Sequence, residues 1–224
     1  ATLDNLSRSA EKSIPRLLQS AIIAANEQVY SLLNGRGNTT IAVMAVDTQD
    51  NAPFGRLFIA SVGDSQIWLI RGGKLIRLNT DHTLANERLL DGATQEEVAR
   101  LERGQSLTRA LGVKRGLDVD TGIYSQVELG IEDTEMVTRA QSARLGDSGI
   151  ALKDSDTIFA TSDGMREINP DDNEPYVKDE EFIRHTYDPD VQRTVRTLIS
   201  YASARRPNDN LSISMIFVPS PSGK

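Results

Sequence analysis

Apolar residues recur along this chain at two spacings, three to four residues apart in some segments and two apart in others. The longer spacing predicts an amphipathic helix over residues 14–33, which the turn residues Asn34 and Gly35 end, and a second helix over residues 189–204. Apolar and β-branched segments between and after these helices predict strands. They are expected at residues 39–46, 57–62, 66–70, 75–78, 118–127, 157–161 and 211–218.

The segments between the strands indicate how the strands are connected. The turn Gly63-Asp64-Ser65 predicts a hairpin between residues 57–62 and 66–70, within an antiparallel meander. Residues 79–105 are polar and helix-prone, and Thr94 with Glu97 predicts a capping box there. Residues 130–149 and 167–178 are expected to be loops, and the tail at 219–224 to be disordered. The predicted class is α+β, with two antiparallel sheets covered by helices.

The amino-acid composition limits the kinds of binding and catalytic sites that the chain can form. The chain has 224 residues, a net charge of −7 and no apolar run near 18 residues, so we expect neither nucleic-acid binding nor a membrane span. It has no Cys and two His, which excludes thiolate zinc sites, cysteine nucleophiles and His-rich metal sites. The absence of Cys is consistent with a cytoplasmic location. The 32 acidic residues leave carboxylate sites for Mg or Mn as the metal option.

One carboxylate stands at an informative position. Ser162, Asp163 and Gly164 directly follow the apolar strand predicted at 157–161. A carboxylate at the mouth of a buried strand, next to a Gly that permits close backbone approach, suits a hard cation. Asp-Gly is also a common turn dipeptide, so both readings stay open on this segment alone.

Six short motifs occur in one order and point to a family. They are GNTT at 37–40, VGDSQIWL at 62–69, GKL through TDHT at 73–83, LTRALG at 107–112, SDGM at 162–165 and PNDN at 207–210. This series resembles the PP2C-like (PPM) metal-dependent serine/threonine phosphatases in their bacterial form, over about residues 10–218.

The resemblance implies a single domain over residues 1–224, with a four-layer αββα sandwich. It implies a protein phosphatase that hydrolyses phosphoserine and phosphothreonine by metal-activated water attack at a binuclear Mn or Mg centre, with a third, looser metal in some members. Asp163 and Asp209 match the family's metal ligands. Asp64 matches an aspartate that lies beside the metals or helps to hold the third one. Gly164, Asn210 and Ser65 are expected to shape the turns around these ligands.

Other matched residues are expected to act elsewhere. Asp81, His82 and Arg109 are expected to be structural, and residues 81–105 match the flap beside the family's active site. The implied partner is a phosphorylated protein, with a cognate Ser/Thr kinase system opposing the phosphatase.

The family's N-terminal DGMGG segment, which carries the metal-bridging Asp, has no match here. Three explanations stay open: an omitted N-terminal part, a catalytically inactive domain that binds phosphoproteins or partners, or strands supplied by a partner chain. Removing paired strands exposes sheet edges, which favours the first explanation. The presence of Asp163 and Asp209 favours it too.

Overall fold

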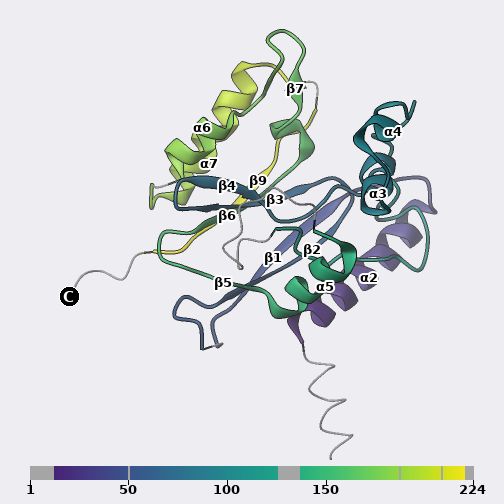
Figure 1. The fold of residues 1–224 in the computed structure, drawn as a ribbon, viewed down its shortest axis with the longest axis horizontal. Helices are drawn as coiled ribbons and strands as arrows, with labels where there is room; N and C mark the ends of the chain where they lie inside the picture. Colours follow the sequence, from purple (N-terminus) through teal and green to yellow (C-terminus); the bar gives the residue numbers. More distant parts are fainter. Residues whose placement is uncertain (1–12, 50, 126–136, 187, 208, 220–224) are drawn as a thin grey trace, which may run out of the picture.

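Two antiparallel sheets, each with helices against its outer face, form the fold of the computed structural model (Figure 1). The structure describes residues 13–49, 51–125, 137–186, 188–207 and 209–219. In the first sheet the strand order is β1-β2-β5, and in the second sheet it is β4-β3-β6-β9. These strands are β1 (Ile41–Asp47), β2 (Arg56–Val62), β3 (Gln66–Arg71), β4 (Lys74–Arg77), β5 (Ile150–Ala151), β6 (Thr157–Thr161) and β9 (Ile213–Phe217).

The core between the sheets follows the two-residue alternation of the strands. Leu57 and Ile59 of β2 pack in one buried cluster with Ile158 of β6. Ala60, the neighbour of Ile59, belongs instead to the cluster under the first sheet's helix. In the same way Phe159 of β6 points to the helices of the second sheet. The alternation therefore supplies both a central core and an outer core for each sheet.

Helices cover the outer faces on opposite sides of the molecule (Figure 1). On the first sheet, α2 (Ile14–Leu33) and α5 (Arg139–Ser148) contact β2. On the second sheet, α7 (Val191–Ala204) contacts β9 and α6 (Asp179–His185) contacts β4. The predicted α+β class with two helix-covered antiparallel sheets is confirmed. Within the described ranges, no helix has both the length and the apolar composition that crossing a bilayer requires.

The helix-prone excursion forms two short helices that project beside the sandwich (Figure 1). These are α3 (Leu84–Leu90) and α4 (Gln95–Ala99). The capping box predicted for Thr94 and Glu97 is confirmed, since the Thr94 side chain accepts from the Glu97 N–H and the Glu97 carboxylate accepts from the Thr94 N–H. We call residues 81–105 the flap.

The predicted hairpin at Gly63-Asp64-Ser65 is wrong. β2 pairs with β1 and β5 in the first sheet, whereas β3 pairs with β4 and β6 in the second. The turn therefore carries the chain from one sheet to the other. The six residues from Leu57 to Val62 are all buried, which suits a strand covered on both faces rather than one arm of a solvated meander.

Three further expectations need correction. Residues 118–125 form no strand, and their one β-bridge to the first sheet joins Asp120 to Ser61. The predicted loop at 130–149 contains α5, while residues 126–136 lie outside the described chain. The predicted loop at 167–178 contains the paired β7 (Ile168–Asn169) and β8 (Glu174–Pro175), and the short helix α6 that follows it was not predicted. Residues 220–224 of the predicted disordered tail lie outside the described residues.

Candidate metal centre

The antiparallel pairing of β6 with β9 brings two predicted site residues together. Thr161, at the end of β6, lies opposite Ile213, at the start of β9. The segment after β6 and the segment before β9 therefore meet at the same end of the sheet. Asp163 lies on the first segment, where it opens the 3-10 turn η2 (Asp163–Met165), and Asp209 lies on the second.

Hydrogen bonds join these two segments. The Ser162 hydroxyl donates to the Asn210 carbonyl over 2.9 Å and accepts from the Ser212 N–H over 3.0 Å. A Cβ on Gly164 would stand 2.8 Å from the Asn210 carbonyl oxygen, so only glycine permits this approach. Gly164 and Asn210 thus lie where the two segments approach each other, and their role in shaping the turns stays a prediction.

Each aspartate is oriented by the peptide that follows it. The Gly164 N–H donates to Asp163 Oδ1 over 2.9 Å, and the Asn210 N–H donates to Asp209 Oδ1 over 2.6 Å. Both carboxylates keep further lone pairs for another ligand.

A third carboxylate completes the group. Oxygens of Asp163, Glu167 and Asp209 all lie within 4.8 Å of one another, and the side chains of Glu167 and Asp209 are exposed. Glu167 reaches this place because η2 folds back, with the Glu167 N–H donating to the Asp163 carbonyl over 2.9 Å. Glu167 is not among the site residues predicted from the sequence. Its spacing of four residues from Asp163 was the available signal, since a helical turn places such residues on one side.

Asp64 lies near this group but outside the set within 4.8 Å. Partial burial, followed by the negative charge of Asp163, raises the pKa of Asp64 above its ordinary value. Ser65, the next residue, has its hydroxyl 2.7 Å from the Thr40 hydroxyl. The structure therefore places Asp64 close enough to feel the charge of the group. A metal-binding role for Asp64 stays a prediction.

The electrostatics of the group are those of crowded like charges. Burial and then Asp209 raise the pKa of Asp163. Burial, followed by Asp163, Asp209 and Asp64, raises the pKa of Glu167. Carboxylates that repel one another in this way are stabilised when a divalent cation binds between them. The oxygen donor set fits a hard cation such as Mn or Mg.

The other residues predicted to be structural have structural contacts. Arg109 pairs with Glu87 of α3 over 2.6 Å and with Asp118 over 3.1 Å, and Asp81 pairs with Arg77 over 2.5 Å. His82 is fully buried. None of these residues belongs to the carboxylate group.

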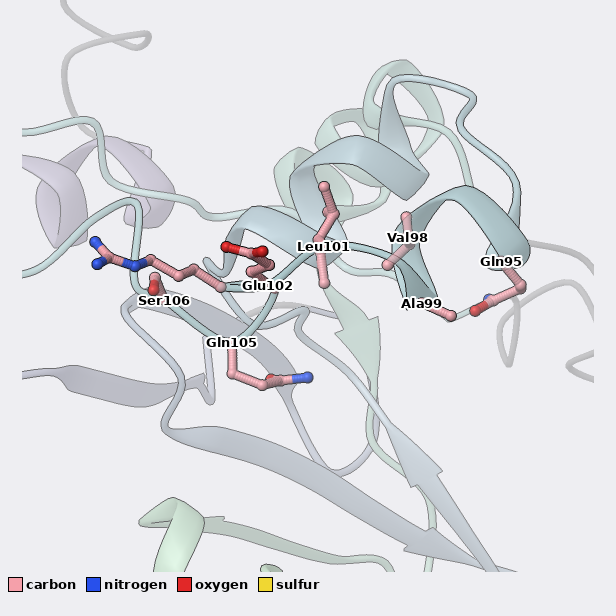
Figure 2. A pocket seen from close by; sticks show the side chains of 10 residues that line it. Gln95, Val98, Ala99, Leu101, Glu102, Gln105 and Ser106 are labelled. Atoms are coloured by element: carbon pink, nitrogen blue, oxygen red, sulfur yellow. The ribbon is translucent and has the colours of Figure 1, made fainter.

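A separate hollow of about 610 Å³ lies in the flap. Figure 2 shows its wall built from α4, which supplies Gln95, Val98 and Ala99, and from the loop that follows. Asp163, Glu167 and Asp209 do not line it. The flap is anchored at Glu87, whose carboxylate accepts from Arg109 and from Arg139 of α5 over 2.5 Å. Burial alone would raise the pKa of Glu87, but these two guanidinium groups outweigh it and lower the pKa.

Known proteins resemble this chain over most of its length. The chain is 28% identical over 167 residues to "Serine/threonine phosphatase stp" of Listeria innocua, covering 71% of this chain and 63% of that protein. It is 24% identical over 231 residues to "Protein phosphatase 2C homolog 1" of Saccharomyces cerevisiae, covering 96% and 72%. The chain thus spans less than two thirds of the length of the Listeria relative.

Solved structures share the fold. The phosphatase MsPP from Mycobacterium smegmatis, solved in complex with cacodylate, superposes with a TM-score of 0.61 at 23% identity, over 95% of this chain and 76% of that one. The catalytic domain of PstP, solved with two manganese ions, gives a TM-score of 0.57 at 19% identity, over 90% and 70%.

A family profile agrees with these similarities and decides the assignment. The profile for "Protein phosphatase 2C" matches residues 3–138, which is more than half of the chain. The chain belongs to the protein phosphatase 2C family.

Proposed function

We propose that this chain is part of a metal-dependent protein phosphatase that hydrolyses phosphoserine and phosphothreonine. The observation that carries the proposal is the approach of Asp163, Glu167 and Asp209 within 4.8 Å at the joined ends of β6 and β9. Family membership supports the reaction class. The pairing of β3 with β6 and of β6 with β9 supports one domain over residues 1–224, because the second sheet needs strands from both halves of the chain.

The carboxylates would hold the metal. Asp163 and Asp209 are the proposed principal ligands, Glu167 is a further ligand, and Asp64 acts beside them or at a third ion. We propose Mn or Mg, two ions and a looser third; the manganese ions of the PstP structure support Mn. Bound divalent ions supply a water of lowered pKa and neutralise charge on the phosphoryl group.

The charge of the site explains why a cation is needed. A phosphate group is anionic, and the carboxylates of Asp64, Asp163, Glu167 and Asp209 would repel it. The N–H groups of Gly164 and Asn210 fix the carboxylates of Asp163 and Asp209, so these two ligands are oriented before a cation arrives. The protein's part is therefore to place negative oxygens that gather cations, and through them the phosphate.

The proposed substrate is a phosphorylated protein in the cytoplasm, with a Ser/Thr kinase as the opposing enzyme. Family membership supports the substrate class.

The test is Mn-dependent hydrolysis of an aryl phosphate, with Mn binding measured by calorimetry in parallel. Because the chain spans less than two thirds of its Listeria relative, the full-length gene product is assayed beside residues 1–224. We expect Asp163→Asn and Asp209→Asn to weaken Mn binding and hydrolysis together. The matched control is Asp172→Asn, an exposed aspartate that accepts the Glu174 N–H in its own turn and lies outside the group.

The outcomes separate the candidate functions. Hydrolysis that is independent of Mn, or unaffected by Asp163→Asn, would contradict the proposal. Binding of phosphoprotein without any turnover by the full-length product would favour an inactive binding domain instead.

A further inference from the structure

The turn that carries Asp64 gets little support from either sheet. β2 ends at Val62 in the first sheet and β3 begins at Gln66 in the second. The peptide groups between them cross from one sheet to the other. Gly63 is buried, so its peptide groups must be satisfied by other parts of the chain, because unpaired buried peptide groups are costly.

His82 satisfies the first residue of this turn from both sides. The Gly63 N–H donates to His82 Nδ1 over 3.0 Å, and the His82 N–H donates back to the Gly63 carbonyl over 2.9 Å. The His82 side chain is fully buried. Gly63 has φ +102°, and a Cβ there would stand 2.3 Å from Thr40 Cγ2. The position next to Asp64 is therefore fixed by a reciprocal pair of hydrogen bonds and by close packing.

The far side of the His82 ring is held by a carboxylate. Because a peptide N–H can only donate, Nδ1 must be the unprotonated nitrogen, and Nε2 carries the proton. Nε2 lies 3.3 Å from Asp120 Oδ2. The Tyr124 hydroxyl donates to the same oxygen over 2.8 Å, and the Gly122 N–H donates to Oδ1 over 2.7 Å.

The charge on Asp120 suits this arrangement. Burial alone would raise the pKa of Asp120, but the hydrogen bonds from His82, Gly122 and Tyr124 outweigh it and lower the pKa. Burial, followed by the charge of Asp120, raises the pKa of Tyr124 to about 12. An ionised Asp120 keeps the proton on Nε2, and this leaves Nδ1 free to accept from Gly63.

Asn79 holds the other end of the same turn. Its side-chain amide donates to the Ser65 carbonyl over 2.9 Å, and its carbonyl oxygen accepts from the Ile67 N–H over 2.7 Å. Asn79 is 3% exposed. The segment 79–82 therefore forms hydrogen bonds to both ends of the Asp64 turn.

The same segment is bonded to the base of the flap. The His82 carbonyl accepts from the N–H and the hydroxyl of Thr108 over 2.8 and 3.0 Å. Thr83 pairs with Leu107 in an isolated bridge, which closes the flap. His82, near the start of the flap, thus joins the base of the flap to the Asp64 turn.

We infer that His82 is a positioning residue of the metal centre: its Nδ1 atom, backed by Asp120, fixes the Gly63-Asp64-Ser65 turn and links it to the flap base. The use of the Asp64 carboxylate at a metal rests on the function proposed above. The claim that His82 positions the turn is independent of that function.

Two substitutions of His82 separate positioning from packing. In His82→Asn the amide oxygen takes the place of Nδ1 and can still accept from Gly63. In His82→Gln the amide group falls near the place of Nε2, which faces Asp120, and Gly63 loses its acceptor. The control is His185→Asn on the far side of the second sheet, where the ring contacts the Tyr201 hydroxyl over 3.2 Å.

Three measurements on residues 1–224 and on the full-length product decide the matter: Mn binding by calorimetry, aryl phosphate hydrolysis, and amide hydrogen exchange at Gly63 without metal. We expect His82→Gln to weaken Mn binding roughly 10–100-fold, as loss of a ligand-orienting partner does. Exchange protection at Gly63 should fall roughly fivefold or more. His82→Asn should restore most of both, and His185→Asn should change neither.

If His82→Gln does not fold, Asp120→Asn gives the comparison. Its amide can donate to Nε2 and favour a proton on Nδ1, which then faces the Gly63 N–H. The expected result is again weaker Mn binding and faster exchange at Gly63.

Equal losses in His82→Asn and His82→Gln, matching their loss of stability, would overturn the inference while leaving the phosphatase proposal standing. Unchanged exchange at Gly63 in His82→Gln would overturn it as well. If the wild type hydrolyses no phosphate, the proposed function fails, and the Gly63 exchange comparison still decides whether His82 positions the turn.

Discussion

Neutralising Asp163 should stabilise the metal-free protein, although Asp163 is the central carboxylate of the site. Asp163 stands within 4.8 Å of both Glu167 and Asp209, and its pKa is raised by burial and then by Asp209. In Asp163→Asn the amide oxygen can keep the hydrogen bond from the Gly164 N–H. The substitution therefore removes repulsion and little else.

The size of the gain follows from Coulomb's law. At 4.8 Å, two like unit charges repel by about 0.9 kcal/mol at the dielectric constant of water, and by about 3.5 kcal/mol at an effective constant near 20. Because Glu167 and Asp209 are exposed, the lower figure applies, and physiological salt screens it to roughly half. Two such pairs give about 0.9 kcal/mol. That corresponds to a rise in Tm of about 2–4 °C for a domain of this size.

The assay is thermal unfolding of wild type and variant, in chelator and in a series of Mn concentrations. In chelator the variant should melt higher. Mn at about 100 times its Kd stabilises a protein that binds it by about 2.7 kcal/mol, so wild type should rise past the variant as Mn is added. The order of the two melting temperatures should therefore reverse between the two conditions.

The pH dependence gives an independent check on the metal-free proteins. A carboxyl group with a raised folded pKa makes the folded state bind protons more readily, so its destabilising effect is absent below the unfolded pKa and grows as pH rises through the folded value. The gap between Asp163→Asn and wild type should thus close as pH falls toward 3.8, the ordinary pKa of the side chain. A variant that melts lower than wild type in chelator at neutral pH would show that Asp163 is not destabilised by its neighbouring carboxylates.

Two further predictions test the surroundings of the site and the rest of the fold. Gly164→Ala should lower stability by about 1–3 kcal/mol and weaken Mn binding, because its Cβ would meet the Asn210 carbonyl at 2.8 Å; calorimetry and unfolding check this against Gly104→Ala, whose nearest contact is an ordinary 3.5 Å. Glu181→Gln should lower stability by up to about 1 kcal/mol at neutral pH, because the hydrogen bonds from Arg205 lower the pKa of Glu181. This contribution is present above the ordinary pKa of 4.5 and is lost as pH falls through the folded pKa, so denaturant unfolding at low pH should show no difference.

The strands were predictable where one periodicity held over enough residues. Residues 157–161 form β6 as expected, and the antiparallel pairing of β6 with β9 explains why Asp163 and Asp209 meet although 46 positions separate their numbers. The α5 helix was missed because its sequence, RAQSARLGDS, has few apolar residues. Its start is fixed instead by a capping box between Thr138 and Gln141. Local polar signals of this kind were read at Thr94 and overlooked at Thr138.

The Gly63-Asp64-Ser65 turn shows a different limit of sequence reasoning. A glycine and two polar residues between apolar strands are typical of a hairpin, and nothing within the turn says that its strands enter different sheets. What places the turn is His82, which lies 19 residues from Gly63, together with Asp120, which lies 38 residues from His82. Such partners are invisible to patterns that span a few residues.

The turns that carry Asp163 and Asp64 are therefore held in place by different contacts, because the strands on either side of them are arranged differently. The Asp163 turn follows β6, and the Ser162 hydroxyl ties it to the segment that leads into β9, the neighbouring strand of the same sheet. The Asp64 turn passes from one sheet to the other, so no neighbouring strand of a single sheet holds it in the way that β9 holds the Asp163 turn. A carboxylate there, repelled by Asp163, would move away unless something outside the sheets held it. The buried ring of His82 meets that need, which explains why an oriented imidazole occupies the interior of the fold.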